Sequence, residues 1–285
     1  MKLMRIGQPG AERPAMLGED GLLRDLSNVV KDIGGDVLGD ATLDRLRKID
    51  PTTLPRMEEA RIGPCVGGIG KFICIGLNYA DHAAEAGMAL PKEPIVFLKA
   101  NSSICGPNDM VRMPRGSTKT DWEVELGVVI GKTAQYVSKT EALDHVAGYC
   151  VINDVSEREY QLERGGQWDK GKSCDTFGPI GPWLVTRDEV PDPQNLKMWL
   201  DVDGVRRQTG STATMIFGVA HVVSYLSQFM TLHPGDVIAT GTPPGVGMGF
   251  KPPVFLKDGQ TVRLGIEGLG EQSQQIAGTP GDAVA

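Results

Sequence analysis

The stretch from Trp122 to Ile130 constrains the fold most strongly, because apolar residues alternate along it with other types. Such alternation predicts a β-strand, in which successive side chains point to opposite faces. Glu123 and Glu125 share the second face, roughly 6 to 7 Å apart at their Cα atoms. Two carboxylates in a strand of mostly apolar residues repel each other and lose hydration on burial. A bound divalent cation would offset both costs. The first face carries Trp122, Val124, Leu126, Val128 and Ile130.

A third carboxylate, Asp154, follows a second apolar run from Ala147 to Ile152. Functional residues are common at such strand ends. Three oxygen donors without a neighbouring Cys or His pair predict a hard cation, Mg²⁺ or Mn²⁺, rather than zinc. The alternative is that Glu123 and Glu125 form a solvated strand edge, while Asp154 caps a helix from residue 155 onward. The acidic pair alone favours that alternative, and the motifs described below favour the metal site.

The composition argues against several classes of protein. A chain of 285 residues with 40% hydrophobic content can bury a full core. The net charge of -7 and the lack of a basic run predict that nucleic acid is not a partner. Five cysteines without a Cys-x-x-Cys motif predict a reducing compartment, which we take to be the cytoplasm. Polar residues interrupt the apolar run 215–232 at helical spacing, so we expect a core helix and no membrane partner.

We predict three parts along the chain: a small N-terminal domain and linker at 1–69, a catalytic domain at 70–277 and a flexible tail at 278–285. The abundance of glycine (37) and proline (19) favours many short elements. Helices are expected at 42–49, 81–87, 139–146, 155–161 and 213–231. Strands are expected at 1–6, 15–23, 72–76, 95–99, 122–130, 147–152, 183–186, 197–202, 205–209, 236–240, 261–266 and 272–276.

A candidate general base follows the first strand of the main domain. His82 and Glu85 are three residues apart and share a face of a short predicted helix. The carboxylate can orient the imidazole and raise its basicity, as a general base requires. The alternative is an exposed His–Glu pair on a solvated helix.

Further candidates lie after Asp154. Arg158 and Gln161 share its face of the predicted helix, where Arg158 either clamps a substrate carboxylate or neutralises the acids. The loop 162–182 is long enough to be functional, or is a surface excursion. The loop from Gly241 to Gly247 either holds an anionic oxygen through its N–H groups and the Thr242 hydroxyl, or is only a rigid turn.

Six motifs follow one another along the chain: Gly76-Leu77-Asn78-Tyr79-Ala80-Asp81-His82, Phe97-Leu98-Lys99, Glu123-x-Glu125-Leu126-Gly127, Asn153-Asp154, Lys172-Ser173-x-Asp175 and Gly241-Thr242-Pro243. Together they resemble the fumarylacetoacetate hydrolase family over residues 70–277. The resemblance implies an α+β fold, a β-rich mixed roll or barrel, in a homodimer. The 1–69 extension and the pattern Lys119-Thr120-Asp121-Trp122 are similar to longer bacterial members, which include diketo-deoxy-sugar-acid hydrolases, ureidoglycolate lyases and hydroxyheptadienedioate isomerases.

The resemblance also implies roles for individual residues. The metal ligands for Mg²⁺ or Mn²⁺ would be Glu123, Glu125 and Asp154. His82 and Glu85 would activate water, and Lys172 and Gln161 would polarise the reacting carbonyl. Contacts with the substrate would come from Arg158, Thr242, Lys99 and Tyr79.

We therefore expect a metal-dependent hydrolase that cleaves a carbon–carbon bond in a 2,4-dioxo acid, such as a diketo-deoxy sugar acid or an acylpyruvate. One alternative is an isomerase, decarboxylase or lyase that acts on a related 2-oxo acid. A non-catalytic, metal-dependent binder of 2-oxo acids is a third, but it would need neither His82 nor Glu85.

Overall fold

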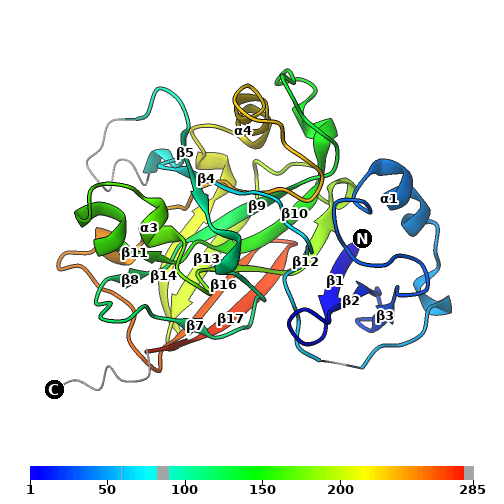
Figure 1. Ribbon diagram of the computed structural model, residues 1–285, viewed down its shortest axis with the longest axis horizontal. Helices are drawn as coiled ribbons and strands as arrows, with labels where there is room; N and C mark the ends of the chain where they lie inside the picture. The colour runs from blue at the N-terminus through cyan, green and yellow to red at the C-terminus, as the bar shows by residue number, and fades with distance from the viewer. Residues whose placement is uncertain (59, 82–89, 279–285) are drawn as a thin grey trace.

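The computed structural model describes residues 1–58, 60–81 and 90–278, and most of its regular elements are β-strands (Figure 1). A large mixed sheet forms the centre of the molecule. Within it β4 and β15 pair in parallel, as do β6 and β12, while the other neighbours are antiparallel. In spatial order its strands are β3 (Leu23–Asp25), β2 (Arg13–Leu17), β1 (Lys2–Ile6), β12 (Gly178–Thr186), β10 (Val146–Asn153), β9 (Val124–Ile130), β15 (Val237–Ala239), β4 (Phe72–Gly76) and β5 (Ile95–Lys99), with β6 (Ile104–Cys105) beside β12.

A second sheet covers one face of the first. Val124, Leu126 and Val128 of β9 share a buried apolar cluster with Leu200 and Leu264 of this second sheet. The strict alternation predicted for β9 therefore has a clear cause, since every second side chain enters the core between the sheets. The second sheet has the order β14 (Val205–Ser211), β13 (Lys197–Val202), β16 (Thr261–Ile266), β17 (Gly270–Ala277) and β7 (Val111–Arg112), and a small ladder joins β8 (Thr120–Asp121) to β11 (Ser156–Glu157).

The described helices are short. The expected helix 42–49 is present and begins slightly earlier than expected. The α-helices are α1 (Asp40–Arg47), α3 (Asp169–Lys172) and α4 (Val219–Leu226), and Glu159–Glu163 forms a π-helical turn. Single 3-10 turns lie at Pro51–Thr53, Asn101–Ser103, Ala142–His145, Arg187–Glu189, Thr212–Thr214 and Gly247–Gly249. No helix within the described ranges is long and apolar enough to cross a membrane.

The N-terminal region continues the central sheet. β1 pairs with β12, and Lys2 lies opposite Val185. Leu3 and Leu26 belong to the same buried cluster as Ile152 of β10. In Figure 1 the blue strands β1 to β3 accordingly lie beside β12. The region expected as a small separate domain at 1–69 thus shares a sheet and a core with the rest of the chain.

Three predicted helices are corrected by the structure. The segment 139–146 contains only the 3-10 turn Ala142–His145. The segment 155–161 forms β11 and part of the π-helical turn, because Ser156 pairs with Asp121 of β8. The segment 213–231 contains the end of the 3-10 turn Thr212–Thr214 and the shorter helix α4. Residues Ile216 and Phe217 stay outside the helix, because the Phe217 N–H donates to the Asn78 side chain and the Ile216 N–H donates to the Asn78 carbonyl. Contacts distant in sequence thus outweigh local helical preference.

Several strands of the large sheet begin or end at the same edge. β9 begins there, and its antiparallel partners β10 and β15 end there. β4 is parallel to β15, so it ends at the same edge. The loops that follow these strands are therefore neighbours, although they are far apart in sequence.

Candidate functional site

Antiparallel pairing of β9 with β10 brings the three predicted acids together. The register places Ile152 opposite Glu125, so that Asp154 lies across from Glu123, and the Asp154 N–H donates to the Glu123 carbonyl at 2.9 Å. One carboxylate oxygen from each acid lies within 4.8 Å of the other two. Thus residues distant in the chain form one cluster because of the strand register.

All three acids are buried. The exposed fraction is 7% for Glu123, 2% for Glu125 and 0% for Asp154. This excludes the alternative of a solvated strand edge. Asp154 is not a helix cap either, because its carboxylate accepts hydrogen bonds from Lys99 and Lys172 and no helix follows it directly.

Three cations neutralise part of this cluster. The Lys172 ammonium lies 2.8 Å from Glu123 Oε2 and 2.7 Å from Asp154 Oδ2. Lys99 Nζ lies 2.5 Å from Asp154 Oδ1, and Arg158 Nη2 lies 2.6 Å from Glu123 Oε1. Within the described part of the chain, no cation forms an ion pair with Glu125, whose Oε2 accepts the Gly241 N–H at 2.8 Å.

The pKa values of the two glutamates diverge accordingly. Burial alone would raise the pKa of Glu123, but the charges of Lys172 and Arg158 outweigh burial and lower it to about 2. Burial raises the pKa of Glu125 well above its usual value, and the neighbouring Asp154 and Glu123 raise it further. Burial would lower the pKa of Lys172, but Asp154 and Glu123 raise it, so the ammonium stays charged. Glu125 is therefore the acid that lacks a countercharge.

This donor set fits a divalent cation. Asp121 joins Glu123, Glu125 and Asp154 as a fourth buried acid of this cluster. Among the described residues, three cations form ion pairs with these acids: Lys99, Arg158 and Lys172. One negative charge is left in excess, and the raised pKa of Glu125 reflects it. Carboxylate oxygens are the ligands that Mg²⁺ and Mn²⁺ prefer.

Asp121 fixes the geometry around Arg158. Its Oδ2 accepts from Arg158 Nε at 2.8 Å, and its carboxylate also accepts the backbone N–H groups of Gly247 and Met248 at 2.7 and 3.0 Å. Arg158 Nη1 donates in turn to Gln161 Oε1 at 3.0 Å. Of the two roles predicted for Arg158, the structure shows neutralisation of the acids.

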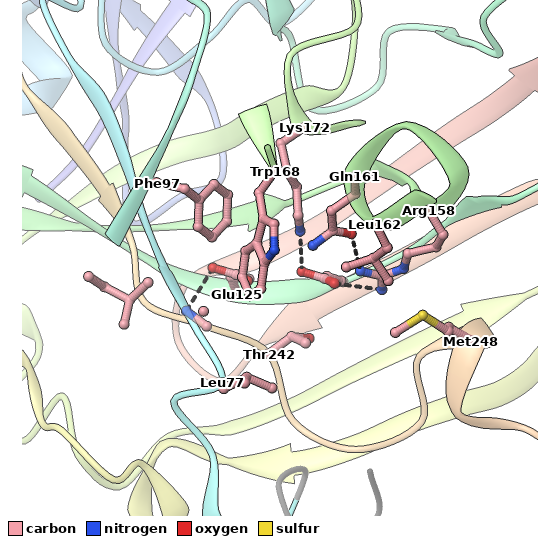
Figure 2. Close-up of a pocket in the computed structure, with 14 residues that line it drawn as sticks. Leu77, Phe97, Glu125, Arg158, Gln161, Leu162, Trp168, Lys172, Thr242 and Met248 are labelled. Atoms are coloured by element: carbon pink, nitrogen blue, oxygen red, sulfur yellow. Dashed lines mark hydrogen bonds and ion pairs between the residues drawn. The ribbon is translucent and has the colours of Figure 1, made fainter. Parts of the chain in front are cut away.

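A pocket of about 150 Å³ opens above the acids (Figure 2). Its polar floor contains Glu123, Glu125 and Lys172, and Figure 2 shows Gln161 and Arg158 beside Lys172. The pocket is lined by Ile75, Gly76, Leu77, Phe97, Glu123, Glu125, Arg158, Gln161, Leu162, Trp168, Lys172, Gly241, Thr242 and Met248.

An aromatic wall stands on one side of this pocket. The rings of Phe97 and Trp168 meet edge to face, with centroids 5.4 Å apart. A Cβ at Gly76 would lie 2.4 Å from the Trp168 ring, so glycine there allows the indole to pack against the end of β4. The next residue, Leu77, has a φ of 51°, which is unfavourable for a side chain of this type and is typical of functional loops.

The structure does not bring every predicted residue to the pocket wall. Tyr79 is fully buried, and its hydroxyl donates to Met198 Sδ, which places it in the core. Lys99 lies behind Asp154, where it also donates to the Val155 carbonyl at 3.1 Å. Both were expected to contact substrate, but their side chains face the protein interior. Thr242 lines the pocket, yet its hydroxyl donates to the Val124 carbonyl at 2.9 Å.

The predicted pair His82 and Glu85 lies outside the described residues. Sequence reasoning assigned none of the six apolar side chains of the pocket to the site: Ile75, Leu77, Phe97, Leu162, Trp168 and Met248. Apolar residues carry no chemical signature, so only the unusual length of the loop 162–182 pointed to Leu162 and Trp168.

Comparison with known proteins identifies the family. The profile described as fumarylacetoacetate (FAA) hydrolase C-terminal matches residues 71–277. The chain belongs to the fumarylacetoacetate hydrolase family. A protein of Burkholderia ambifaria is 70% identical over 276 residues, which cover 96% of this chain and 98% of the relative. Its provisional name says only that it is a hydrolase.

Solved structures of this family include both hydrolases and isomerases. A fumarylacetoacetate hydrolase from Exiguobacterium antarcticum is 37% identical, with a TM-score of 0.84 and coverage of 98% of this chain and 100% of that one. A 5-carboxymethyl-2-hydroxymuconate delta-isomerase from Mycobacterium smegmatis is 33% identical, with a TM-score of 0.78 and coverage of 98% and 99%. A maleylpyruvate hydrolase from Sphingobium, solved with manganese(II) and pyruvate, is 29% identical, with a TM-score of 0.80 and coverage of 98% and 99%. Family membership therefore indicates an enzyme that acts on small molecules, with a divalent metal.

Proposed function

We propose that this protein is a Mg²⁺- or Mn²⁺-dependent hydrolase that cleaves a carbon–carbon bond in a 2,4-dioxo acid. The observation that carries the proposal is the convergence of three buried carboxylates, Glu123, Glu125 and Asp154, below a pocket whose floor also contains Lys172 and Gln161. The excess negative charge of the cluster supports a divalent ligand, and the remaining positive charge then suits one substrate carboxylate.

Glu123, Glu125 and Asp154 would hold the metal. When bound, it supplies Lewis-acid polarisation of the 2-oxo group. Lys172 keeps its proton because its pKa is raised, so it acts as a fixed positive charge and not as a base. Gln161 Oε1 accepts from Arg158 Nη1, so we assign the role of donor to the substrate to the amide N–H groups of Gln161.

His82 and Glu85, the pair to which the family resemblance assigns this role, would activate the attacking water. His82 takes a proton from water, and the water oxygen bonds to the 4-oxo carbon. Lys172 and Gln161 hold the oxyanion that forms there. The bond between carbons 3 and 4 then breaks, and its electron pair stays with carbon 3 as an enolate. The oxyanion re-forms a carbonyl as this bond breaks, so that the fragment with carbon 4 leaves as a carboxylic acid. His82 gives up the proton it took, through water, to carbon 3, and the enolate becomes a 2-oxo acid.

The direct test is a Mg²⁺-dependent screen of acylpyruvates, diketo-deoxy sugar acids, ureidoglycolate and unsaturated dicarboxylic acids, with products identified by mass. Two fragments from a 2,4-dioxo acid are expected. An unchanged carbon count would instead identify an isomerase, which is the second candidate because a structure 33% identical to this chain is an isomerase.

The base assignment has its own test. His82→Ala should abolish turnover while Mg²⁺ binding is retained, because the imidazole is proposed to move a proton and not to hold the metal. His233→Ala, at an exposed histidine elsewhere, is the matched control. Unchanged turnover in His82→Ala would remove the assigned base.

From the same resemblance we also propose a homodimer. Light scattering should then give about twice the chain mass of 30.6 kDa.

A further inference from the structure

The pocket has two chemically distinct zones. The charged and amide groups all lie at its floor. Around the mouth stands a collar of five apolar side chains, and Figure 2 shows Trp168 and Phe97 on one side and Met248 on another. Leu162 and Met248 are 43% and 39% exposed, so part of this apolar surface faces solvent. The collar consists of Leu77, Phe97, Leu162, Trp168 and Met248.

No described cation beside the collar lacks an acidic partner. The Lys172 ammonium lies 5.2 Å from the Phe97 ring centroid, but Glu123 and Asp154 hold it in ion pairs. Among the described residues that line the pocket, only Arg158 and Lys172 are positively charged. Arg158 is engaged by Asp121, Glu123 and Gln161, while Lys172 bridges two acids of the floor. A second carboxylate at the distal end of a substrate would therefore enter an apolar collar without a partner, which is unfavourable.

An apolar distal group has the opposite effect. It would cover the exposed parts of Leu162 and Met248 and contact the Trp168 and Phe97 rings, which removes apolar surface from water. We propose that this site selects 2-oxo acids with a single carboxylate, bound at the floor, and an uncharged, mainly apolar distal group. The proposal rests on the proposed function and narrows its substrate class from 2,4-dioxo acids in general to those with an apolar acyl group.

Binding can be measured without turnover. Isothermal titration of the full-length, Mg²⁺-loaded protein would compare 2-oxohexanoate with 2-oxoadipate, which have six carbons each and differ in a terminal methyl or carboxylate. We expect 2-oxohexanoate to bind at least about tenfold more tightly. Lengthening the acid from 2-oxobutanoate to 2-oxohexanoate should raise the affinity roughly threefold per methylene. Equal or tighter binding of 2-oxoadipate, or no gain with chain length, would overturn the proposal.

A charge placed at the mouth gives a second, independent readout. Met248→Lys adds a cation to the collar and keeps the backbone N–H that Asp121 binds. It should reduce the preference for 2-oxohexanoate over 2-oxoadipate at least fivefold. Met110→Lys is the matched control, because Met110 is 46% exposed and does not line the pocket. An unchanged preference in Met248→Lys, or the same change in both variants, would contradict the role of the collar.

The outcomes separate this inference from the proposed function. If 2-oxoadipate binds better and a dicarboxylic dioxo acid is cleaved, the hydrolase proposal stands and the collar proposal fails. If 2-oxohexanoate binds better but no dioxo acid is cleaved, the binding preference stands and the hydrolase proposal fails. If neither acid binds in the presence of Mg²⁺, both fail.

Discussion

Glu123 and Glu125 are two residues apart, yet the protein holds them in opposite electrostatic states. Lys172 and Arg158 stabilise the Glu123 carboxylate through ion pairs. Among the described residues no cation pairs with Glu125, whose carboxylate accepts the Gly241 N–H. The pKa of Glu125 is raised above its usual value near 4.5, so its contribution to stability is present below that pH and is lost as pH rises. Glu123, with its pKa lowered to about 2, loses its contribution only as pH falls below 4.5.

The first prediction concerns Glu125→Gln. In the presence of a chelator, wild-type stability should fall as pH rises from 5 to 8, while the variant should lose most of this slope and be the more stable protein at pH 8. The same change should weaken Mg²⁺ binding at least about tenfold, because a ligand is lost. Urea denaturation and metal titration measure the two effects, and parallel pH curves for the two proteins would refute the explanation.

Lys172 supplies the second prediction. Replacing it by methionine removes the proposed oxyanion donor and should lower kcat about 100- to 1000-fold at saturating Mg²⁺. Lys170→Met is a close control, since Lys170 lies on the same short helix α3 with an exposed side chain. A Lys172→Met enzyme within twofold of the wild-type kcat would show that the ammonium is not part of the chemistry.

The sequence predicted the charged residues of the site better than its apolar ones. Glu123, Glu125 and Asp154 stood out because acids are rare in apolar strands, and the β9–β10 register then explains why they meet. Tyr79 and Lys99 were expected at the substrate, but a motif does not determine the direction of a side chain.

At the scale of elements, the packing of α3 against the π-helical turn sets the position of Lys172 relative to Gln161. A Cβ at Gly171 would lie 2.3 Å from the Glu157 carbonyl oxygen and 2.5 Å from Gln161 N. The third prediction is that Gly171→Ala separates these elements, destabilises the protein by about 1–3 kcal/mol and lowers kcat/KM at least tenfold. Thermal unfolding and steady-state kinetics measure both effects.

A matched glycine tests this explanation. Gly39 precedes α1, and a Cβ there would meet its nearest neighbour only at 3.9 Å. Gly39→Ala should therefore leave kcat/KM and the midpoint of unfolding nearly unchanged. If Gly171→Ala behaves like Gly39→Ala, close packing of α3 is not needed.

Strands were predicted more accurately than helices. β4, β5, β13 and β16 have the predicted bounds, because their apolar runs end at clear turn residues. The segment 155–161 shows helical spacing but pairs with β8, and no local pattern reveals a partner more than thirty residues away. The π-helical turn that places Gln161 beside Arg158 was likewise not predictable from local sequence.

At the scale of the whole molecule, the N-terminal region is part of the catalytic fold. β1 covers the edge of β12, and Leu3, Met16 and Leu26 pack in one cluster with Ile152 and Leu184. The fourth prediction is that deleting residues 1–69 exposes this edge and cluster and abolishes cooperative folding. Circular dichroism and thermal melting of the truncated chain test this prediction. A soluble, active truncated protein would contradict it and show that the catalytic domain folds without residues 1–69.

The central claim is that Glu123, Glu125 and Asp154 hold one divalent cation at the floor of the pocket. A crystal of the full-length protein soaked in Mn²⁺ tests this most directly through its anomalous difference map. We expect a single strong peak at coordination distance, about 2 Å, from one oxygen of each of the three carboxylates. A peak at another site, or three carboxylates without a peak at saturating Mn²⁺, would contradict the account.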